Sequence, residues 1–286
     1  MKYIIFSFFY LLSLLPLKLL YLFSSLTSFI LSDIFKYRKK IIIQNLQTCF
    51  PEKSSAEREI IMRNYYRNFG EVLVETIKLL SISPKTLKKM MFVKEDKDWE
   101  EFLSEDKTVM LYFAHRGNFE IGSQCLPFIM NKKLFGAYKP FKTQWVEWLW
   151  RKVRNRFNTH PVAVKNIVRT IFHNESSDIV YGFLNDQSPT LGDQHLWVKF
   201  FDRDTLFFTG PEKLARKFKN PVYFADLKRI KRGQYQGSVK LLSKKPFEHE
   251  EGFLTERYAN ELERAICEQP DNWLWSHKRW KHIKNN

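Results

Sequence analysis

The longest apolar stretch of the chain covers residues 3–31 and contains one charge, Lys18, and one helix breaker, Pro16. A helix of that length would measure about 43 Å, which exceeds the ~30 Å hydrocarbon core of a bilayer. The stretch therefore predicts a membrane anchor within residues 1–35, either one tilted span kinked at Pro16 or a re-entrant hairpin in one leaflet. A cleaved signal peptide fits poorly, because the apolar region is too long and no small-residue cleavage site ends it.

Beyond the anchor, apolar positions recur with the periods of strands and helices. Short apolar runs at 109–114, 134–138 and 179–184 are typical of buried strands, and alternating runs at 222–230 and 234–242 predict a hairpin. Helical spacing predicts helices at 54–80, which begins with a capping box, and at 120–130, 144–156, 166–173 and 258–266. We therefore expect one α/β domain over residues 36–286, with a mixed, largely buried sheet flanked by helices.

Three further segments have less regular patterns. Residues 45–51, NLQTCFP, interrupt the helical spacing, and the apolar segments 197–201 and 206–208 are expected to be partly exposed. Thr209-Gly210-Pro211-Glu212 has the spacing of a second capping box. The N–H groups at the start of that helix would suit an anion or a substrate carbonyl, which makes Thr209 and Gly210 candidate binding residues.

Charge and composition restrict the class of partner. The chain of 286 residues has 47 Lys and Arg against 31 Asp and Glu, a formal charge of +16, and 16% of it is aromatic. Such a charge suits an anionic membrane, an acidic protein or a nucleic acid. The basic residues that follow the anchor, at 36 and 38–40, predict that the domain lies on the cytoplasmic side of the membrane. The three cysteines are widely spaced, which predicts reduced thiols.

Polar residues follow the apolar run at 109–114 directly, as His115-Arg116-Gly117-Asn118, with Glu120 two positions later. In open α/β sheets, ligands bind beyond the carboxyl ends of the strands. A His and an acidic residue at this spacing occur by chance roughly once in such a chain, so the structural context decides. The other match, His173 with Asp178, precedes the strand at 179–184 and would lie at the opposite edge. Asp186 and Gln187 follow that strand and would share the edge of His115.

These residues predict acyl transfer without a resident cofactor or metal. The sequence has no His-Glu-x-x-His, paired Cys-x-x-Cys, glycine-rich phosphate loop or Gly-x-Ser-x-Gly. A neutral His115 would take a proton from a substrate hydroxyl while Glu120 fixes its tautomer. The oxyanion of a thioester carbonyl would then need donors, either the backbone N–H groups of Gly117 and Asn118 or a guanidinium such as that of Arg154. Cys125 as a nucleophile is disfavoured by its apolar helix.

In its order of motifs the chain resembles the bacterial lipid A late acyltransferases, the lauroyl and myristoyl transferases, within the glycerolipid acyltransferase group that has His-x-x-x-x-Asp/Glu. The motifs are NLQTCFPE at 45–52, NFGEVLVE at 68–75, AHRGNFE at 114–120, VRNRF at 153–157, GFLNDQ at 182–187, FF at 200–201, TG at 209–210 and NWLWSHKRWK at 272–281. Each motif is weak alone, and their joint order is specific. Arg116 and Phe119 inside the central motif depart from the commonest pattern.

The resemblance implies transfer of a fatty acyl chain from acyl carrier protein, or from coenzyme A as an alternative donor, to a hydroxyl or hydroxyacyl group of a lipid A precursor. The reaction would occur at the cytoplasmic face of the bacterial inner membrane. His115 and Glu120 match the family's catalytic pair. The polar positions that would bind substrate or stabilise the oxyanion are Arg116, Gly117, Asn118, Arg154, Arg156, Asp186, Gln187, Thr209 and Gly210.

Two alternatives remain open at this point. An acyltransferase acting on another polar glycolipid or aminolipid would have the same active-site residues. A membrane-tethered nucleic-acid-binding protein would explain the positive charge, but it would require basic residues on one face with aromatics that stack on bases. Here the basic residues are spread along the chain and the aromatics lie in apolar runs, so no nucleic-acid partner is expected.

Overall fold

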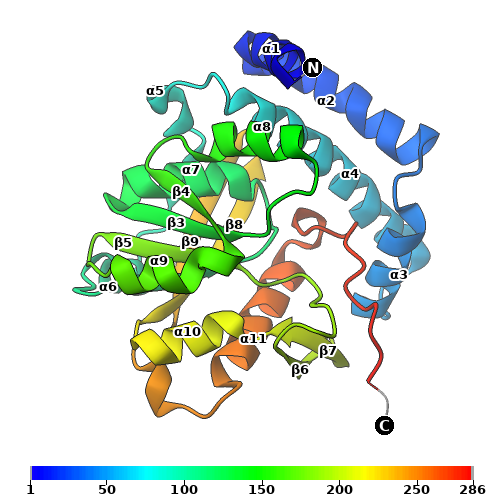
Figure 1. Ribbon diagram of the computed structural model, residues 1–286. Helices are drawn as coiled ribbons and strands as arrows, with labels where there is room; N and C mark the ends of the chain where they lie inside the picture. The colour runs from blue at the N-terminus through cyan, green and yellow to red at the C-terminus, as the bar shows by residue number, and fades with distance from the viewer. Residues whose placement is uncertain (1, 285–286) are drawn as a thin grey trace.

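The fold is built on a seven-stranded mixed sheet with the strand order β1-β9-β8-β2-β5-β3-β4, described by a computed structural model over residues 2–284 (Figure 1). The strands are β1 (Met91–Val93), β2 (Val109–Phe113), β3 (Lys133–Tyr138), β4 (Thr159–Ala163), β5 (Ile179–Leu184), β8 (Val222–Lys231) and β9 (Gln234–Ser243). Five strands, β8, β2, β5, β3 and β4, are parallel, whereas β9 pairs antiparallel with β8 and parallel with β1. The expected mixed α/β sheet is confirmed.

Helices cover both faces of this sheet. In chain order they are α3 (Lys39–Cys49), α4 (Ser55–Lys78), α5 (Pro84–Leu87), α6 (Lys97–Leu103), α7 (Phe119–Met130), α8 (Gln144–Arg154), α9 (Ile167–His173), α10 (Gly210–Phe218) and α11 (Phe253–Glu268). The predicted capping box of α4 is confirmed, because Ser54 and Glu57 each accept a hydrogen bond from the other's backbone N–H.

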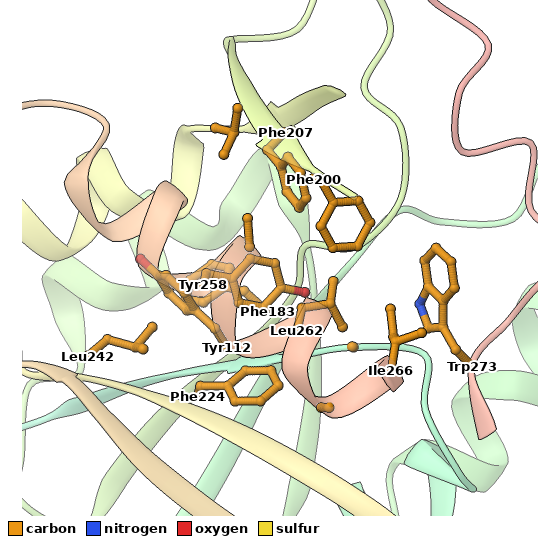
Figure 2. Close-up of a cluster of buried hydrophobic side chains, with 14 of the residues drawn as sticks. Tyr112, Phe183, Phe200, Phe207, Phe224, Leu242, Tyr258, Leu262, Ile266 and Trp273 are labelled. Carbon is orange, nitrogen blue, oxygen red and sulfur yellow. The ribbon is translucent and has the colours of Figure 1, made fainter. Parts of the chain in front are cut away.

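Side chains of the central strand β2 alternate between two cores. Val109 and Leu111 pack with α6 and α7, whereas Met110 and Tyr112 pack with α9 and α11. Figure 2 shows the second core, where Tyr258 of α11 lies among Tyr112, Phe183 and other apolar side chains of the sheet. Because β2 is buried on both faces, its sequence is a continuous apolar run rather than an alternating one.

The N-terminal stretch forms two helices, α1 (Lys2–Leu14) and α2 (Leu17–Phe29), separated at Pro16, and a π-helical turn (Ile30–Ile34) extends α2. Leu17–Ile34 is the one helix within residues 2–284 that is long and apolar enough to cross a membrane, and 11% of it is buried. Its inner face packs on α4 at Gly70, where an added Cβ would lie 2.8 Å from the carbonyl oxygen of Ser24.

Two local predictions are wrong, and a third holds in part. Asn45 does not interrupt a helix: it lies within α3, and its amide donates to the carbonyls of Trp275 and His277. The segments expected to be partly exposed form the hairpin of β6 (His195–Phe200) and β7 (Arg203–Phe208), where Trp197 and Phe208 are half-buried but Phe200 and Phe207 are fully buried.

The second capping box does not form either. The side chain of Thr209 makes no capping hydrogen bond, and the carboxylate of Glu212 instead accepts from Gly252 and Thr255 at the start of α11. Glu212 therefore joins two helices rather than closing the end of its own, because the folded chain brings unpaired N–H groups of α11 to it.

Candidate active site

His115 and Asp186 lie side by side at the carboxyl edge of the sheet. Strands β2 and β5 are neighbours and pair Phe113 with Leu184, so the residue two positions after each strand reaches the same place. Nδ1 of His115 lies 2.7 Å from Oδ1 of Asp186, and the backbone N–H of His115 donates to Oδ2 at 2.9 Å. The indole N–H of Trp273 also donates to Oδ2, at 2.9 Å. Three donors therefore fix the orientation of this carboxylate.

These contacts keep Asp186 ionised. Its side chain is 2% exposed, and burial alone would raise the pKa of its carboxyl group. The charge of His115 and the hydrogen bonds from His115 and Trp273 act in the opposite direction and lower the pKa of Asp186 to about 2. At neutral pH the residue is thus a carboxylate that accepts a hydrogen bond from the Nδ1–H group of the imidazole.

The other ring nitrogen of His115 is the one available for chemistry. Because Nδ1 donates to Asp186, the hydrogen-bond network assigns the lone pair of the neutral ring to Nε2. The amide nitrogen of Gln187 lies 3.3 Å from Nε2, and the ring of Phe119 packs edge-on against the imidazole at 4.8 Å between centroids. The His115 side chain is 15% exposed, so Nε2 can reach a substrate hydroxyl.

Glu120 does not orient His115, which corrects the expected pairing. Its two carboxylate oxygens lie 3.1 Å from Nε of Arg154, and Nη2 of Arg154 makes a further short bond to one of them. No hydrogen bond joins Glu120 to His115 anywhere in residues 2–284. Burial lowers the pKa of Arg154, but the charge of Glu120 outweighs it and raises that pKa, so the guanidinium stays charged.

An apolar pocket of about 560 Å³ lies beside this ion pair. Glu120 and Arg154 are its charged residues, Phe113 and Phe119 also line it, and its other walls come from α7 and the strands β3, β4 and β5. Gly182 of β5 pairs with Gly136 of β3, so the floor lacks side chains across two adjacent strands. The ring of Phe113 covers Gly182, whereas a Cβ added at Gly136 would meet no atom within 4 Å.

A second apolar pocket, of about 420 Å³, lies on the other side of α7. It is lined by residues of β1, β8 and β9, and it shares Phe113 and Phe119 with the first pocket. Phe119 also contacts the His115 ring, so one side chain joins both pockets to the imidazole. The arrangement therefore places apolar surface on both sides of α7 close to the base.

Two of the predicted polar residues are structural in this fold. Arg116 is buried and its guanidinium pairs with Asp226, with 2.6 Å between Nε and Oδ1. Arg156 donates to the backbone carbonyls of Leu79 and Ile82 after the end of α4. Neither guanidinium contacts His115 or Asp186 within residues 2–284.

The backbone donor expected at Gly117 is also used differently, and the side chain of Asn118 has a structural role. Gly117 has a φ of 54°, in the left-handed region that favours glycine, and its N–H donates to the carbonyl of Asn272 at 2.9 Å. It is therefore not free for an oxyanion. The side chain of Asn118 caps α7 by accepting from the N–H of Ile121, and its amide donates to Glu75. Asn118 thus positions the start of α7.

Thr209 and Gly210 are not joined to the site. Within residues 2–284 the N–H of Thr209 donates to the carbonyl of Gln194, and neither residue hydrogen-bonds to His115, Asp186 or Arg154. Asp186 and Gln187, by contrast, lie where the strand-end rule places them.

Sequence reasoning missed three residues that support the site. Trp273 donates to Asp186, and His277 accepts from the backbone N–H of Ser188 at 3.0 Å. Both are in the NWLWSHKRWK segment, whose sequence alone gives neither residue a role. Glu75 is fully buried and accepts from Asn118, Tyr235 and Tyr21, and burial raises the pKa of its carboxyl group. The sequence signal for Glu75 is its position beside apolar residues in NFGEVLVE, which indicates a buried carboxyl group.

Metal ligation has no support in the geometry. Across residues 2–284, no group of three or more His, Cys, Asp or Glu side chains is arranged to hold a metal ion. The chemistry available from the described residues is a histidine base with a carboxylate partner, a paired guanidinium and two apolar pockets.

Comparison with known proteins agrees with this arrangement. The family model for bacterial lipid A biosynthesis acyltransferases matches residues 1–282. The lipid A biosynthesis palmitoleoyltransferase of Escherichia coli K12 is 22% identical over 252 residues, 86% of this chain and 79% of the relative. The E. coli lipid A biosynthesis lauroyltransferase is 23% identical over 249 residues, 86% of this chain and 80% of the relative. A lipid A biosynthesis acyltransferase of Haemophilus influenzae is 24% identical over 256 residues, 85% and 78% of the two chains. The chain therefore belongs to the bacterial lipid A biosynthesis acyltransferase family and is an acyltransferase.

Proposed function

We propose that the protein transfers a fatty acyl chain from the thioester of acyl carrier protein to a hydroxyl or hydroxyacyl group of a lipid A precursor. The observation that supports this most directly is the position of His115. Its Nδ1 is held by the ionised Asp186, and its ring packs against Phe119, which lines both apolar pockets. A base between two apolar pockets suits a reaction whose donor and acceptor both have fatty chains.

In the proposed mechanism, Nε2 of His115 removes the proton of the acceptor hydroxyl as the oxygen attacks the thioester carbonyl. Asp186 keeps Nδ1 protonated and stabilises the imidazolium that forms. The thiolate of the donor leaves as the tetrahedral intermediate collapses, and the proton on Nε2 passes to that sulfur. No covalent acyl-enzyme is required, because the attacking group is the hydroxyl of the acceptor itself.

Arg154 is the proposed donor to the oxyanion or to a polar group of the acceptor. Glu120 binds its Nε and Nη2, and Nη1 has no hydrogen bond within residues 2–284. The guanidinium is 17% exposed and lies at the wall of the first pocket. Glu120 would then act by holding the Arg154 guanidinium in a fixed orientation. Preorganised donors of this kind contribute about 10²–10³-fold to a reaction rate.

The apolar helices α1 and α2 support a location at the bacterial inner membrane, and the basic residues at 36 and 38–40 favour the cytoplasmic face. Acyl carrier protein is acidic as a class and would suit the charge of +16. Donor and acceptor are both substrates in this proposal, so the reaction needs no resident cofactor.

The test is acyl transfer by the purified full-length protein from acyl-acyl carrier protein to a lipid A precursor in detergent micelles. We expect His115→Ala to lose at least about 10³-fold in kcat, since the base is gone, and Arg154→Ala to lose about 10²-fold. His160→Ala is the matched control, because His160 is exposed and lies near the amino end of β4, away from the carboxyl edge of the sheet. A His115→Ala variant with normal turnover would refute the mechanism.

Mass spectrometry of lipid extracts from cells with and without the protein identifies the acceptor. A lipid A species lighter by one acyl group in the deletion strain is the expected result. A missing acyl group on a different glycolipid or on an aminolipid would instead support that alternative acceptor, and no change in any lipid would refute the proposed reaction.

A further inference from the structure

Helix α8 lies against the N-terminal helices and is hardly buried. Of its eleven residues only Val153 is buried, although Trp145, Trp148 and Trp150 are among them. The ring of Trp148 packs edge-on against Tyr3 and Phe6 of α1, with centroid distances of 5.8 and 5.2 Å. Figure 1 shows α8 at the end of the molecule where α1 lies. The outer faces of α1 and α8 therefore form one continuous surface.

This surface has four cations that lack an acidic partner. Lys139, Lys142, Arg151 and Lys152 are all exposed, and none forms an ion pair with any residue in 2–284. The nearby acidic side chain, Glu147, is bound by the hydroxyl of Tyr138 and the N–H of Phe141. An open hollow lined by Phe141, Trp148, Arg151 and Lys152 is part of the same region. We name residues 139–152 the basic-aromatic segment.

The neighbouring face of α1 is apolar and exposed, with Ile4 at 75%, Phe8 at 62% and Leu11 at 65%. Tryptophans and unpaired cations beside an apolar helix are the pattern of a membrane interface, where indole rings lie at headgroup level and cations meet anionic lipid. An acidic protein would match the cations, but it would leave the exposed face of α1 without an apolar partner. The observations favour lipid.

We infer that the basic-aromatic segment is a second membrane contact, which binds anionic lipid headgroups in the leaflet that holds α1. The inference rests on the proposed function, since it takes the N-terminal helices as the anchor. Tyr138 and Arg154, which flank the segment, both line the first apolar pocket. Docking of the segment would therefore place the mouth of that pocket at the lipid surface, where a lipid acceptor can enter without crossing water.

The experiment places the environment-sensitive fluorophore NBD on the full-length protein in lipid nanodiscs. In a Cys267→Ser background, Gln144→Cys reports on the segment and Asn166→Cys reports on the exposed residue before α9. Nanodiscs contain phosphatidylcholine alone or phosphatidylcholine with phosphatidylglycerol. We expect the fluorescence of the probe at 144 to rise about twofold in anionic discs and this rise to disappear in high salt. The fluorescence of the probe at 166 should stay unchanged.

Two variants that lose the same number of positive charges distinguish binding by this segment from general attraction of a basic protein to anionic lipid. Replacement of the four cations of the segment by glutamine should abolish the gain in anionic discs. The control set, Lys165, Arg169, Lys217 and Lys219, is exposed and likewise forms no ion pair within residues 2–284, and its replacement by glutamine should leave the gain intact. Equal behaviour of the two variants would overturn the inference.

Two further outcomes are distinguishable. A probe response to soluble acyl carrier protein in neutral discs, with none to anionic lipid, would assign the surface to the carrier protein and overturn the lipid assignment. Acyl transfer is measured on the same discs: normal transfer without a lipid response refutes only this inference, and a lipid response without transfer by the unmodified protein refutes only the proposed reaction.

Discussion

Replacement of Asp186 by asparagine preserves shape and removes charge, so it isolates the role of this carboxylate. Oδ2 of Asp186 accepts from two N–H groups, the backbone of His115 and the indole of Trp273, whereas Oδ1 faces only Nδ1 of His115. The asparagine carbonyl oxygen will therefore occupy the Oδ2 position, because the amide NH₂ would leave both donors there unpaired. The NH₂ group then faces Nδ1, which must become an acceptor. The ring proton moves to Nε2, and the base is lost.

The magnitude has two parts. The surroundings lower the pKa of Asp186 from 3.8 to about 2 although burial acts in the opposite direction, so the net stabilisation of the carboxylate is roughly 2 kcal/mol. The charge of His115 is the first of the favourable contributions, and its loss would slow the reaction by roughly 10- to 100-fold. The wrong tautomer adds to this effect, and the total expected loss is about 10³-fold in kcat, within the usual contribution of general base catalysis.

Initial rates of acyl transfer measure the effect, with KM for each substrate determined separately and thermal unfolding used to check the fold. Glu120→Gln is the matched comparison, because it removes the other carboxylate at the same edge of the sheet. It should weaken the aiming of Arg154 and raise KM for a substrate, with a smaller loss in kcat than Asp186→Asn. The reasoning is refuted if Asp186→Asn retains more than about a tenth of normal kcat, and a larger loss from Glu120→Gln would return the orienting role to Glu120.

Three further changes test other parts of the structure. Gly136→Leu should shorten the transferred acyl chains by roughly two methylenes, because the leucine side chain enters the first pocket. Mass spectra of the products measure the chain lengths, with Gly136→Ala as a variant that adds a smaller side chain. An unchanged distribution of chain lengths would contradict the prediction. Burial lowers the pKa of His277 to about 4, so between pH 6.5 and 4 the unfolded state binds more protons and stability falls as pH falls. His277→Gln, which can still accept from Ser188, should flatten that dependence in denaturant titrations; an equally steep curve would exclude His277 as its source. Glu75→Gln should lower the free energy of unfolding by about 2 kcal/mol, because the NH₂ group of the glutamine would face another donor, such as the amide of Asn118. An unchanged unfolding midpoint would show that the hydrogen bonds around residue 75 rearrange without cost.

The central elements could be predicted because their signals are local. β2 and β5 are apolar runs of five and six residues, and the hairpin of β8 and β9 alternates around a turn with glycine. The edge strand β4 contains Pro161 and exposed positions, so its sequence has no strand pattern. It forms because β3 offers a free edge, which is a tertiary property. The same holds for β6 and β7, whose burial depends on α11.

The site was predictable as a location and not as a set of contacts. The rule for strand ends places His115, Glu120 and Asp186 at one edge, but two carboxylates then compete for one imidazole. The choice depends on the adjacency of β2 and β5 and on the direction of each side chain. Glu120 is near in sequence, which favoured it, whereas Asp186 is 71 residues away and in contact. Proximity along the chain was the misleading signal.

The geometry also explains why histidine and glutamate are separated by four residues. His115 lies two residues after the end of β2, Gly117 turns the chain with positive φ, and Asn118 caps the helix that starts at once. The next two residues lie on the first turn of α7 and point in different directions: Phe119 packs against the imidazole, and Glu120 reaches Arg154. A spacing shorter by one residue would place the carboxylate at the position of Phe119, beside the imidazole, and a spacing longer by one would rotate it by about 100° away from α8. The spacing thus specifies a helix start that supports the base on one side and aims a guanidinium on the other, while the carboxylate that orients the base comes from the neighbouring strand.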